Sequence, residues 1–437
     1  MPDQVNVSNG EQQRALWLGT FAFTVCFAVW TLFSIIGIQI KQQLALNDTE
    51  FGLLVATPVL TGSLSRTLLG IWADQFGGRR ILALVMLSSA VATWLLTWAA
   101  SYPMFLLAAL FMGLAGGSFP VGIAYVASWF PARRQGTALG IFGAGNVGAA
   151  VTSLLAPTVM VAYGWMAVAR TWSVGLALAA VVFYAFSKED PLRAARRTSG
   201  VASMPFLKQI EPLKNLQVWR FSLYYFFVFG GFVALALWLP RFLIGAYGLD
   251  IEAAGMVAAF YTLPASLFRA GGGWLSDRIG ARRVMYWTFS VGALCTLLLS
   301  YPDTRYLVKG VHGDLSFHLA LGVVPFTVLV FVLGFFMSLG KAAVYKHIPV
   351  YYPSHVGAVG GMVGMIGGLG GFVLPITFGA LNDLVGVWTS CFMLLFVLVT
   401  CALAWMHFAI RRMERRQFPQ VGRAGDLPEI MAARERA

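Results

Sequence analysis

Residues 66–80, RTLLGIWADQFGGRR, occur a second time as residues 269–283, RAGGGWLSDRIGARR. An arginine, two glycines, an aspartate and a basic pair recur at one fixed offset, and no gap is needed to align them. The matching positions are Arg66/Arg269, Gly70/Gly273, Asp74/Asp277, Gly77/Gly280, Arg79/Arg282 and Arg80/Arg283. Such a match indicates that the chain contains an internal duplication.

Arg66 and Arg269 each lie inside an apolar segment, eight residues before the aspartate that ends it. At a rise of roughly 1.5 Å per residue, each arginine lies about 12 Å inside a membrane boundary, near the middle of a ~30 Å hydrocarbon layer. A charge at that depth costs about 2.5–3.5 kcal/mol on insertion scales. No Asp or Glu lies deep within any apolar segment of the sequence. A bound anion or water is therefore the simplest counter-ion.

The composition places the chain among polytopic membrane proteins. Of 437 residues, 58% are hydrophobic and only 11% are charged, with a mean hydropathy of +0.74. The net charge of +13 does not indicate a nucleic-acid partner, because 23 of the 31 basic residues fall in the termini and in alternate loops on one side. By the positive-inside rule, both termini are expected in the cytoplasm of an inner membrane protein.

Apolar runs long enough to cross a bilayer predict twelve transmembrane helices. The strands of a membrane β-barrel would be shorter and would alternate in polarity, so helices are favoured. The predicted spans are 16–40, 51–73, 81–100, 104–130, 137–161, 166–186, 221–243, 253–276, 284–301, 317–343, 356–381 and 388–410.

A polar segment with seven basic residues, 188–220, divides these helices six plus six. A second duplicated block agrees with the division, since residues 129–148 align with 351–370, and the extra length between the two blocks is expected in an external loop at 301–317. The sequence predicts an all-α membrane fold with two pseudo-symmetric halves. Its parts are a cytoplasmic N-terminus (1–14), a bundle (15–187), a linker (188–220), a second bundle (221–410) and a tail (411–437).

Enzymatic chemistry is disfavoured. The four cysteines, Cys26, Cys295, Cys391 and Cys401, fall in apolar segments without metal-ligand spacing, so small core residues are the expected role. No nucleophile elbow or pair of carboxylates appears, and the glycine-rich strings lie inside apolar helices rather than after a strand. The sequence therefore predicts neither a metal site nor a cofactor.

The two basic loops with an aspartate resemble the signature loop of the major facilitator superfamily, G-x-x-x-D-x-x-G followed by a basic residue. The motif occurs between the second and third helices of each half, as it does in that superfamily. The resemblance implies that these residues hold helix ends together and gate the bundle. They are Asp74, Arg79, Arg80, Asp277, Arg282 and Arg283.

The glycine-rich stretches GIFGAGNVG (140–148) and GMVGMIGGLGGFVLP (361–375) resemble the two signatures of the nitrate/nitrite porter family, a branch of that superfamily. That family also carries one arginine in the second helix and one in the eighth, matched by Arg66 and Arg269. The resemblance extends over residues 16–410. One departure is that Ala149 and Ala150 stand where the family often has glycines, which predicts looser helix packing there.

The resemblance implies a nitrate held between Arg66 and Arg269, with the amide of Asn146 and aromatic rings around it. The aromatic positions that match are Phe119, Tyr225 and Phe229. Glycines beside such a site, Gly145 and Gly367 among them, would leave backbone N–H groups open to a small ligand, although tight helix packing alone also explains them.

Elementary chemistry agrees with this implication. Nitrate is a planar anion, and a guanidinium is a planar fork that can donate two parallel charge-assisted hydrogen bonds to it. The alternative is that each arginine binds backbone carbonyls or stacks on an aromatic ring. Lys341 is the remaining charge inside a predicted span. The first interpretation is that its side chain snorkels toward the cytoplasmic end, and the second is that it attracts the anion on the exit path or takes part in energy coupling.

Together with the resemblance, these observations predict a secondary transporter of nitrate, nitrite or both that works by alternating access, as a monomer in the lipid bilayer. Exchange of nitrate for nitrite and symport of nitrate with protons both remain open. A transporter of another small or organic anion on the same scaffold is an alternative, because fold does not fix substrate. A sensor that binds the anion without moving it is another, although the segment after Ile410 is short for an output domain.

Overall fold

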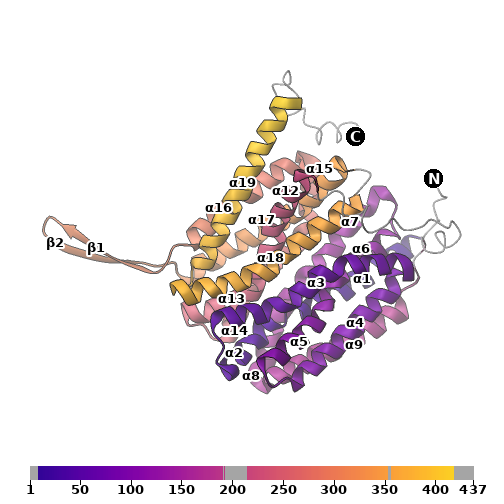
Figure 1. Cartoon of the computed structure of the whole chain (residues 1–437), viewed down its shortest axis with the longest axis horizontal. Coiled ribbons are helices and arrows are strands. Elements are labelled where there is room, and N and C mark those ends of the chain that lie inside the picture. The colour runs from indigo at the N-terminus through magenta and orange to yellow at the C-terminus, as the bar shows by residue number, and fades with distance from the viewer. Residues whose placement is uncertain (1–7, 190, 192–213, 353–355, 418–437) are drawn as a thin grey trace.

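The computed structural model describes residues 8–189, 191, 214–352 and 356–417, nearly all of them helical (Figure 1). The N-terminal half contains α1 (Asn9–Trp30), α2 (Phe33–Leu44), α3 (Asp48–Phe76), α4 (Gly78–Leu95), a 3₁₀ turn (Leu96–Trp98), α5 (Tyr102–Met112), α6 (Ser118–Ala127), α7 (Ala132–Gly143), α8 (Gly148–Tyr163) and α9 (Trp165–Phe186). Two further 3₁₀ turns, Gly113–Gly117 and Ala144–Val147, join α5 to α6 and α7 to α8.

The C-terminal half repeats this pattern with one addition. Its helices are α12 (Leu216–Tyr225), a π-helical turn (Phe226–Gly231), α13 (Phe232–Tyr247), α14 (Ile251–Leu267), α15 (Arg269–Ile279), α16 (Ala281–Leu299), α17 (Val323–Tyr351), α18 (Val356–Val385) and α19 (Ser390–Gln417). The addition is a pair of strands, β1 (Thr304–Gly310) and β2 (Gly313–Leu319), between α16 and α17.

Most of the predicted spans are present. Among the described residues, ten helical segments are long and apolar enough to cross a membrane, and α14 with α15 forms an eleventh that bends by 43°. The predicted span at 284–301 corresponds to α16, which packs against α17 and α19 but is not among those ten. The count of twelve therefore stays a prediction at this one helix.

The glycine repeated in the two duplicated motifs makes a sharp turn between helices. Gly77, between α3 and α4, has φ 93°, and Gly280, between α15 and α16, has φ 90°. A side chain rarely tolerates positive φ, so glycine is the residue that lets the chain reverse here. The duplication thus conserves a backbone conformation as well as the charges around it.

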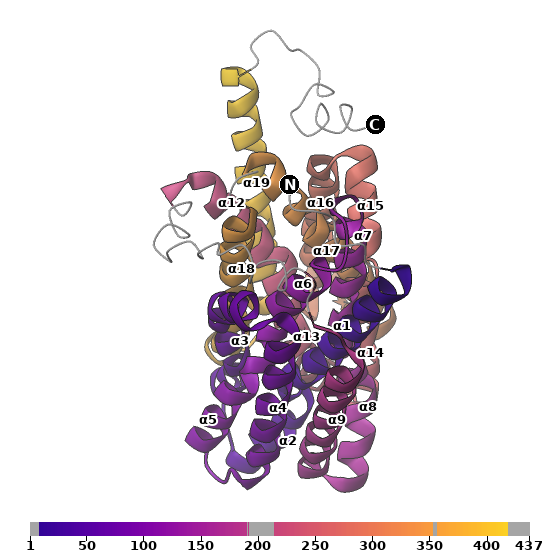
Figure 2. The ribbon, with the colours of Figure 1, turned by 90° about the vertical axis from the view of Figure 1, so that its right-hand side faces the viewer.

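Both described ends of the chain, near Ser8 and Gln417, lie at the same end of the bundle (Figures 1 and 2). We call it the terminal end, and the opposite one the hairpin end because the strands leave the bundle there (Figure 1). The two halves lie side by side, with α3 against α18 and α8 against α14 along their interface. Helix α15, which carries Arg269, packs against α7 of the other half, so the helices that carry the duplicated arginines both lie at the interface.

Polar contacts tie the two halves together at the hairpin end. Asp48, at the start of α3, lies 3.2 Å from Lys41 of its own half and 3.1 Å from Arg241 of the other half. Its carboxylate also accepts a hydrogen bond from the amide of Asn382 on α18. The Asp48 carboxylate is only 9% exposed, so this contact lies within the interface.

Asp383 of α18 adds a second link at the same place. Its carboxylate accepts hydrogen bonds from the backbone N–H groups of Asp48 (3.1 Å) and Thr49 (2.7 Å). Free N–H groups at a helix N-terminus favour a negative charge, so the C-terminal half caps a helix of the N-terminal half. We refer to Lys41, Asp48, Arg241, Asn382 and Asp383 as the hairpin-end clasp.

The segment 301–317, predicted as a polar loop, instead forms most of a β-hairpin that projects from the bundle (Figure 1). Residues Thr304 and Leu319 pair at its base and Gly310 and Gly313 at its tip. Tyr306, Val308, Leu315 and Phe317 share one face by alternation, and the rings of Tyr306 and Phe317 stack 5.1 Å apart. The prediction of a plain loop at 301–317 was wrong, while the bundle around the hairpin is helical as predicted.

Several boundaries differ from the prediction, among them the start of the tenth span, which is Val323 in α17 rather than residue 317. Helix α1 begins at Asn9 because Ser8 caps it, accepting a hydrogen bond from the N–H of Glu11. Helix α12 begins at Leu216, within the predicted linker, and α19 continues to Gln417, within the predicted tail. The rest of the linker from 192 to 213 and the tail from 418 onward lie outside the described residues.

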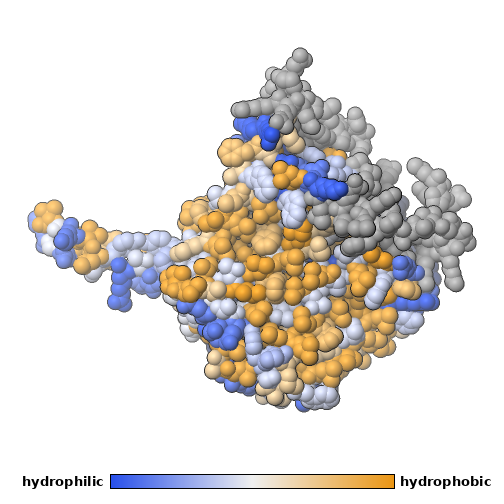
Figure 3. All heavy atoms as spheres, viewed as in Figure 1, coloured by the Kyte–Doolittle hydropathy of each residue, from blue (hydrophilic) through white to orange (hydrophobic). Residues whose placement is uncertain are grey.

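Apolar side chains cover the outer surface between the two ends (Figure 3). Examples that are more than half exposed come from both halves and include Leu84, Val161, Phe408 and Leu294. Such large continuous apolar surfaces are incompatible with water and fit a lipid environment. Cys401, predicted to be a core residue, is exposed on this surface, while the other three cysteines are buried and free.

Candidate functional site

Arg66 and Arg269 are both buried in the core, with relative exposures of 5% and 7%. Arg66 lies within α3, and Arg269 is the first residue of α15, directly after the break at Phe268. The guanidinium carbons lie 5.6 and 5.2 Å from the centroid of the same ring, that of Phe119. The structure therefore brings the duplicated arginines together around one aromatic side chain.

The two arginines leave much of their hydrogen-bonding capacity unused. Arg66 donates from Nη1 to the carbonyl of Gly364 on α18 at 2.8 Å. Its Nε, and Nη1 of Arg269, are buried and have no partner among the described residues. No ion pair within those residues includes either arginine. Two buried cations without a carboxylate favour an anion at this place.

Asn146 is completely buried in the 3₁₀ turn Ala144–Val147 that interrupts the fifth span. Neither its side-chain oxygen nor its side-chain nitrogen has a hydrogen-bond partner among the described residues. Leaving a buried amide unsatisfied costs about 1–3 kcal/mol, so such a group indicates that a ligand or water is held there. A short 3₁₀ segment within a helix is itself frequent at functional hinges.

The predicted aromatic residues surround Arg66. Phe229 lies in the π-helical turn, with its ring centroid 5.2 Å from the Arg66 guanidinium. The ring of Tyr225 stacks on that of Phe229 at 5.0 Å. Phe119 is the second residue of α6 in the N-terminal half, and α6 directly follows a 3₁₀ turn. Arg66 is thus flanked by rings from both halves, and π-helical turns are often found at functional sites.

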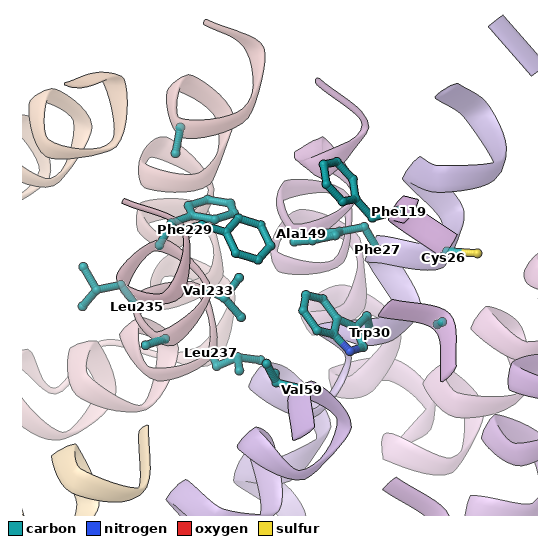
Figure 4. Close-up of a cluster of buried hydrophobic side chains, with 14 of the residues drawn as sticks. Cys26, Phe27, Trp30, Val59, Phe119, Ala149, Phe229, Val233, Leu235 and Leu237 are labelled. Atoms are coloured by element: carbon teal, nitrogen blue, oxygen red, sulfur yellow. The ribbon is translucent and has the colours of Figure 1, made fainter. Parts of the chain in front are cut away.

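Figure 4 shows Phe119 and Phe229 on the two sides of the interface between the halves. Below them, toward the hairpin end, lie buried apolar side chains that include Trp30, Val59 and Leu237 (Figure 4), each at most 1% exposed. The indole N–H of Trp30 donates to the carbonyl of Pro58 at 2.9 Å. The arginines are therefore separated from the hairpin end by an apolar layer and by the clasp.

The glycines that touch the arginines differ from the two that the sequence singled out. A Cβ at Gly143 would lie 2.9 Å from Nε of Arg269, and a Cβ at Gly368 would lie 3.5 Å from the guanidinium carbon of Arg66. A Cβ at Gly145 would instead meet Phe23 of α1, and one at Gly367 would meet Tyr225. Glycines of both signatures therefore make room for the guanidinium groups as well as for helix packing.

Lys341 lies deep in the core. It is completely buried, and its ammonium nitrogen lies 3.3 Å from the ring centroid of Phe232, at the start of α13. The nitrogen has no hydrogen-bond partner among the described residues. The interpretation as a snorkelling side chain is wrong, because the lysine points into the bundle rather than toward its end. A third cation without a carboxylate therefore belongs to this core.

Tyr345 and Ser63 were not predicted, yet both lie beside Arg66. The hydroxyl of Tyr345 donates to the carbonyl of Gly360 at 3.1 Å, and its ring packs edge to face on Tyr225 at 5.0 Å. The hydroxyl of Ser63 is buried one turn before Arg66 and has no partner among the described residues. Tyr345 follows Lys341 by one helical turn, a spacing that could have indicated it.

The basic motif residues lie at the terminal end, away from the arginine pair. Arg79 donates to the carbonyl of Tyr184 at 2.6 Å, and Arg80 lies 3.6 Å from Glu189. In the other half, Asp277 pairs with Lys346, and Arg282 donates to the hydroxyl of Tyr351 at 3.2 Å. Arg283 is exposed. The side chain of Asp74 lies outside the described part of the structure.

Comparison with known proteins identifies the superfamily of the chain. The sequence model of the Major Facilitator Superfamily matches residues 18–308. A "Probable nitrate/nitrite antiporter NarK1" from Thermus thermophilus is 41% identical over 431 residues, which cover 95% of this chain and 96% of that protein. A "Nitrite extrusion protein" from Bacillus subtilis (strain 168) is 29% identical, covering 92% of this chain and 96% of that protein.

Solved structures show the same fold. The chain superposes with a TM-score of 0.69 on an inward-facing, occupied bacterial homologue of the human lysosomal transporter Spinster. That alignment covers 92% of this chain and 98% of the other at 16% sequence identity, which supports the architecture alone.

A two-half helical bundle with a buried cationic site at its interface defines a secondary transporter rather than an enzyme. Its sequence relatives narrow the class. The chain belongs to the nitrate/nitrite porter family of the major facilitator superfamily.

Proposed function

We propose that this protein carries nitrate and nitrite across an inner membrane, binding the anion between Arg66 and Arg269. The observation that carries the proposal is the pair of buried guanidinium groups that share the ring of Phe119 and have N–H groups without partners. A planar anion with three oxygens can accept from both forks at once. The unpaired amide of Asn146 supplies a further donor on the side of the N-terminal half.

Counterflow in proteoliposomes tests the substrate directly. Vesicles loaded with unlabelled nitrate should accumulate labelled nitrate from outside, and unlabelled nitrite should compete with it. Sulfate and a small carboxylate serve as competitors for the alternative of another small or organic anion. If the carboxylate abolishes the signal and nitrite does not, the protein transports a different anion. If binding is measurable but no counterflow occurs, it is a sensor.

Asn146→Ala is expected to weaken equilibrium binding of labelled nitrate by about 1–3 kcal/mol, because an amide donor to the buried anion is lost. Ser153→Ala, which removes another buried polar side chain farther along the same span, should leave binding unchanged. Equal affinity of Asn146→Ala and the wild type would exclude the amide from the site.

We further propose that transport proceeds by alternating access, with the hairpin-end clasp closing one face of the site. The clasp joins α3 of one half to α13 and α18 of the other. When the halves rock apart at this end, the contacts of Asp48 with Arg241 and Asn382 must break. The clasp therefore stabilises the shape in which the arginines are closed off from the hairpin end.

Asp48→Asn is expected to favour opening at the hairpin end by about 1–3 kcal/mol. The free-energy contribution of this partly buried ion pair should lie between those of exposed and of fully buried pairs. The measure is labelling of Val59→Cys, a buried position in α3 on the hairpin side of Arg66, by a membrane-impermeant thiol reagent. Labelling should rise in Asp48→Asn. It should not rise in Asp303→Asn, which removes a carboxylate of the same end that bridges no halves. Unchanged labelling in Asp48→Asn would mean that the clasp does not hold this end shut.

We also propose that the terminal end faces the cytoplasm, on the basis of the bias in basic residues. Val311→Cys at the tip of the hairpin, where the side chain is 97% exposed, should react with an impermeant thiol reagent in intact cells. Gln13→Cys, exposed at the terminal end, should react only after the cells are opened. The reverse pattern would invert the topology. Since each half supplies one arginine, a single chain contains the whole site, and we propose that the monomer is the working unit.

A further inference from the structure

A cationic cavity lies at the terminal end, between α12 and α19, apart from the arginine pair. It measures about 460 Å³, a size typical of ligand pockets. Arg220 and Arg412 line it together with apolar side chains that include Trp405 and Phe408. The two helices lie next to each other at this end (Figures 1 and 2).

Within the described residues, no carboxylate pairs with the two arginines of this cavity. No ion pair among the described residues includes Arg220 or Arg412, and Nε of Arg220 is buried without a hydrogen-bond partner. A guanidinium group satisfies itself best with a carboxylate or a phosphate. The two positive charges of the cavity therefore complement a negatively charged phosphate group.

The position of the cavity relative to the bilayer selects the kind of phosphate. Helix α19 crosses as Ser390–Met413, so Arg412 lies at the last turn of the span, and Arg220 lies near the first turn of the span that begins at Leu216. Phe408 is 71% exposed and Leu216 is 60% exposed, so the apolar wall is continuous with the lipid-facing surface. Basic pockets of this kind at the ends of transmembrane helices bind lipid headgroups.

We propose that this cavity binds an anionic phospholipid, with its phosphate between Arg220 and Arg412 and an acyl chain along Trp405 and Phe408. A free phosphate would contact only the arginines, whereas a phospholipid would contact the arginines with its headgroup and the apolar wall with its acyl chain. A lipid bound there would join α12, the first helix of the C-terminal half, to α19, its last helix.

Native mass spectrometry of the delipidated full-length protein tests the proposal by titration with phosphatidylglycerol or phosphatidylcholine. The wild type should bind phosphatidylglycerol more tightly. The double variant Arg220→Gln/Arg412→Gln should lose that preference, with affinity falling roughly fivefold per arginine. Arg412→Gln alone, at an exposed position that folding tolerates, should show the single step. Arg14→Gln, exposed at the same end outside the cavity, is the matched control and should bind like the wild type.

Each other outcome overturns the assignment. If the wild type shows no preference for phosphatidylglycerol over phosphatidylcholine, the cavity does not select an anionic phospholipid. A double variant that keeps the preference binds the lipid elsewhere, and an equal loss in Arg14→Gln indicates general surface attraction. Inorganic phosphate that displaces the lipid at millimolar concentration would identify a free anion site instead.

Discussion

Arg66→Lys or Arg269→Lys is expected to abolish most nitrate binding in a protein that still inserts and folds. Each substitution keeps the positive charge but replaces a planar fork with a single ammonium group on a flexible stem. The bound anion then loses at least one charge-assisted hydrogen bond from that half, at a cost of about 1.5–3 kcal/mol for each bond. Contacts with the ring of Phe119 are also lost in both variants, because both guanidinium groups lie against it.

The measurement is equilibrium binding of labelled nitrate, followed by counterflow in proteoliposomes. Arg170→Lys is the matched control, since Arg170 is an exposed arginine of α9 whose guanidinium carbon lies 5.9 Å from the ring centroid of Trp94. That variant should bind and transport like the wild type. If both Arg66→Lys and Arg269→Lys transport normally, the anion does not lie between the two forks.

The second prediction concerns energy coupling, for which Lys341 is the candidate proton-binding residue. Moving one negative charge inward against an inside-negative potential costs about 2.3 kcal/mol per 100 mV, so net uptake of nitrate needs another source of energy. Exchange for internal nitrite is electroneutral and needs no group that takes up a proton. Symport with protons usually relies on an intramembrane Asp, Glu or His. Among the described residues, the buried His347 packs on Phe221 and Tyr351 toward the terminal end, and Lys341 is the titratable group that lies deep in the core. Because no Asp, Glu or His of the described residues lies beside the arginine pair, we propose exchange.

Liposomes that contain a pH dye distinguish the two modes. Nitrate added outside, with no nitrate or nitrite inside, should give no internal acidification under exchange. Lys341→Ala should weaken anion binding, because it removes a buried cation from the same core, but it should not change the proton balance. Lys309→Ala, on the exposed hairpin, is the control and should have no effect on either. Acidification in the wild type that disappears in Lys341→Ala would establish symport and identify the coupling residue.

The sequence predicted the two halves and the arginine pair because both leave a signal in the chain itself. Long apolar runs indicate spans, and an arginine inside one of them is too costly to be incidental. The duplication then predicted that both arginines lie at one depth. In the structure, both guanidinium groups lie beside the ring of Phe119. Packing around each residue was a different matter.

Local irregularities of the helices were not predictable in the same way. The 3₁₀ turn at Asn146, the π-helical turn at Phe229 and the break at Phe268 leave no signal in span length or mean hydropathy, because the span continues on both sides of each of them. The direction of Lys341 was missed for a related reason. Whether a lysine reaches outward or inward depends on which ring lies beside it, and Phe232 is distant in the sequence.

Within the part of the chain that the structure describes, Arg66, Arg269 and Lys341 are buried in one core and form no ion pair with a carboxylate, and this affects the carrier when no anion is bound. When the bundle closes around an unoccupied site, like charges remain together in a medium of low polarity, where their repulsion is larger than in water. A bound anion removes part of that penalty, so the loaded carrier changes shape more readily than the idle one. In the proposed exchange mode, the same charges would suppress slippage, in which the carrier returns without an anion and one anion crosses without its counterpart.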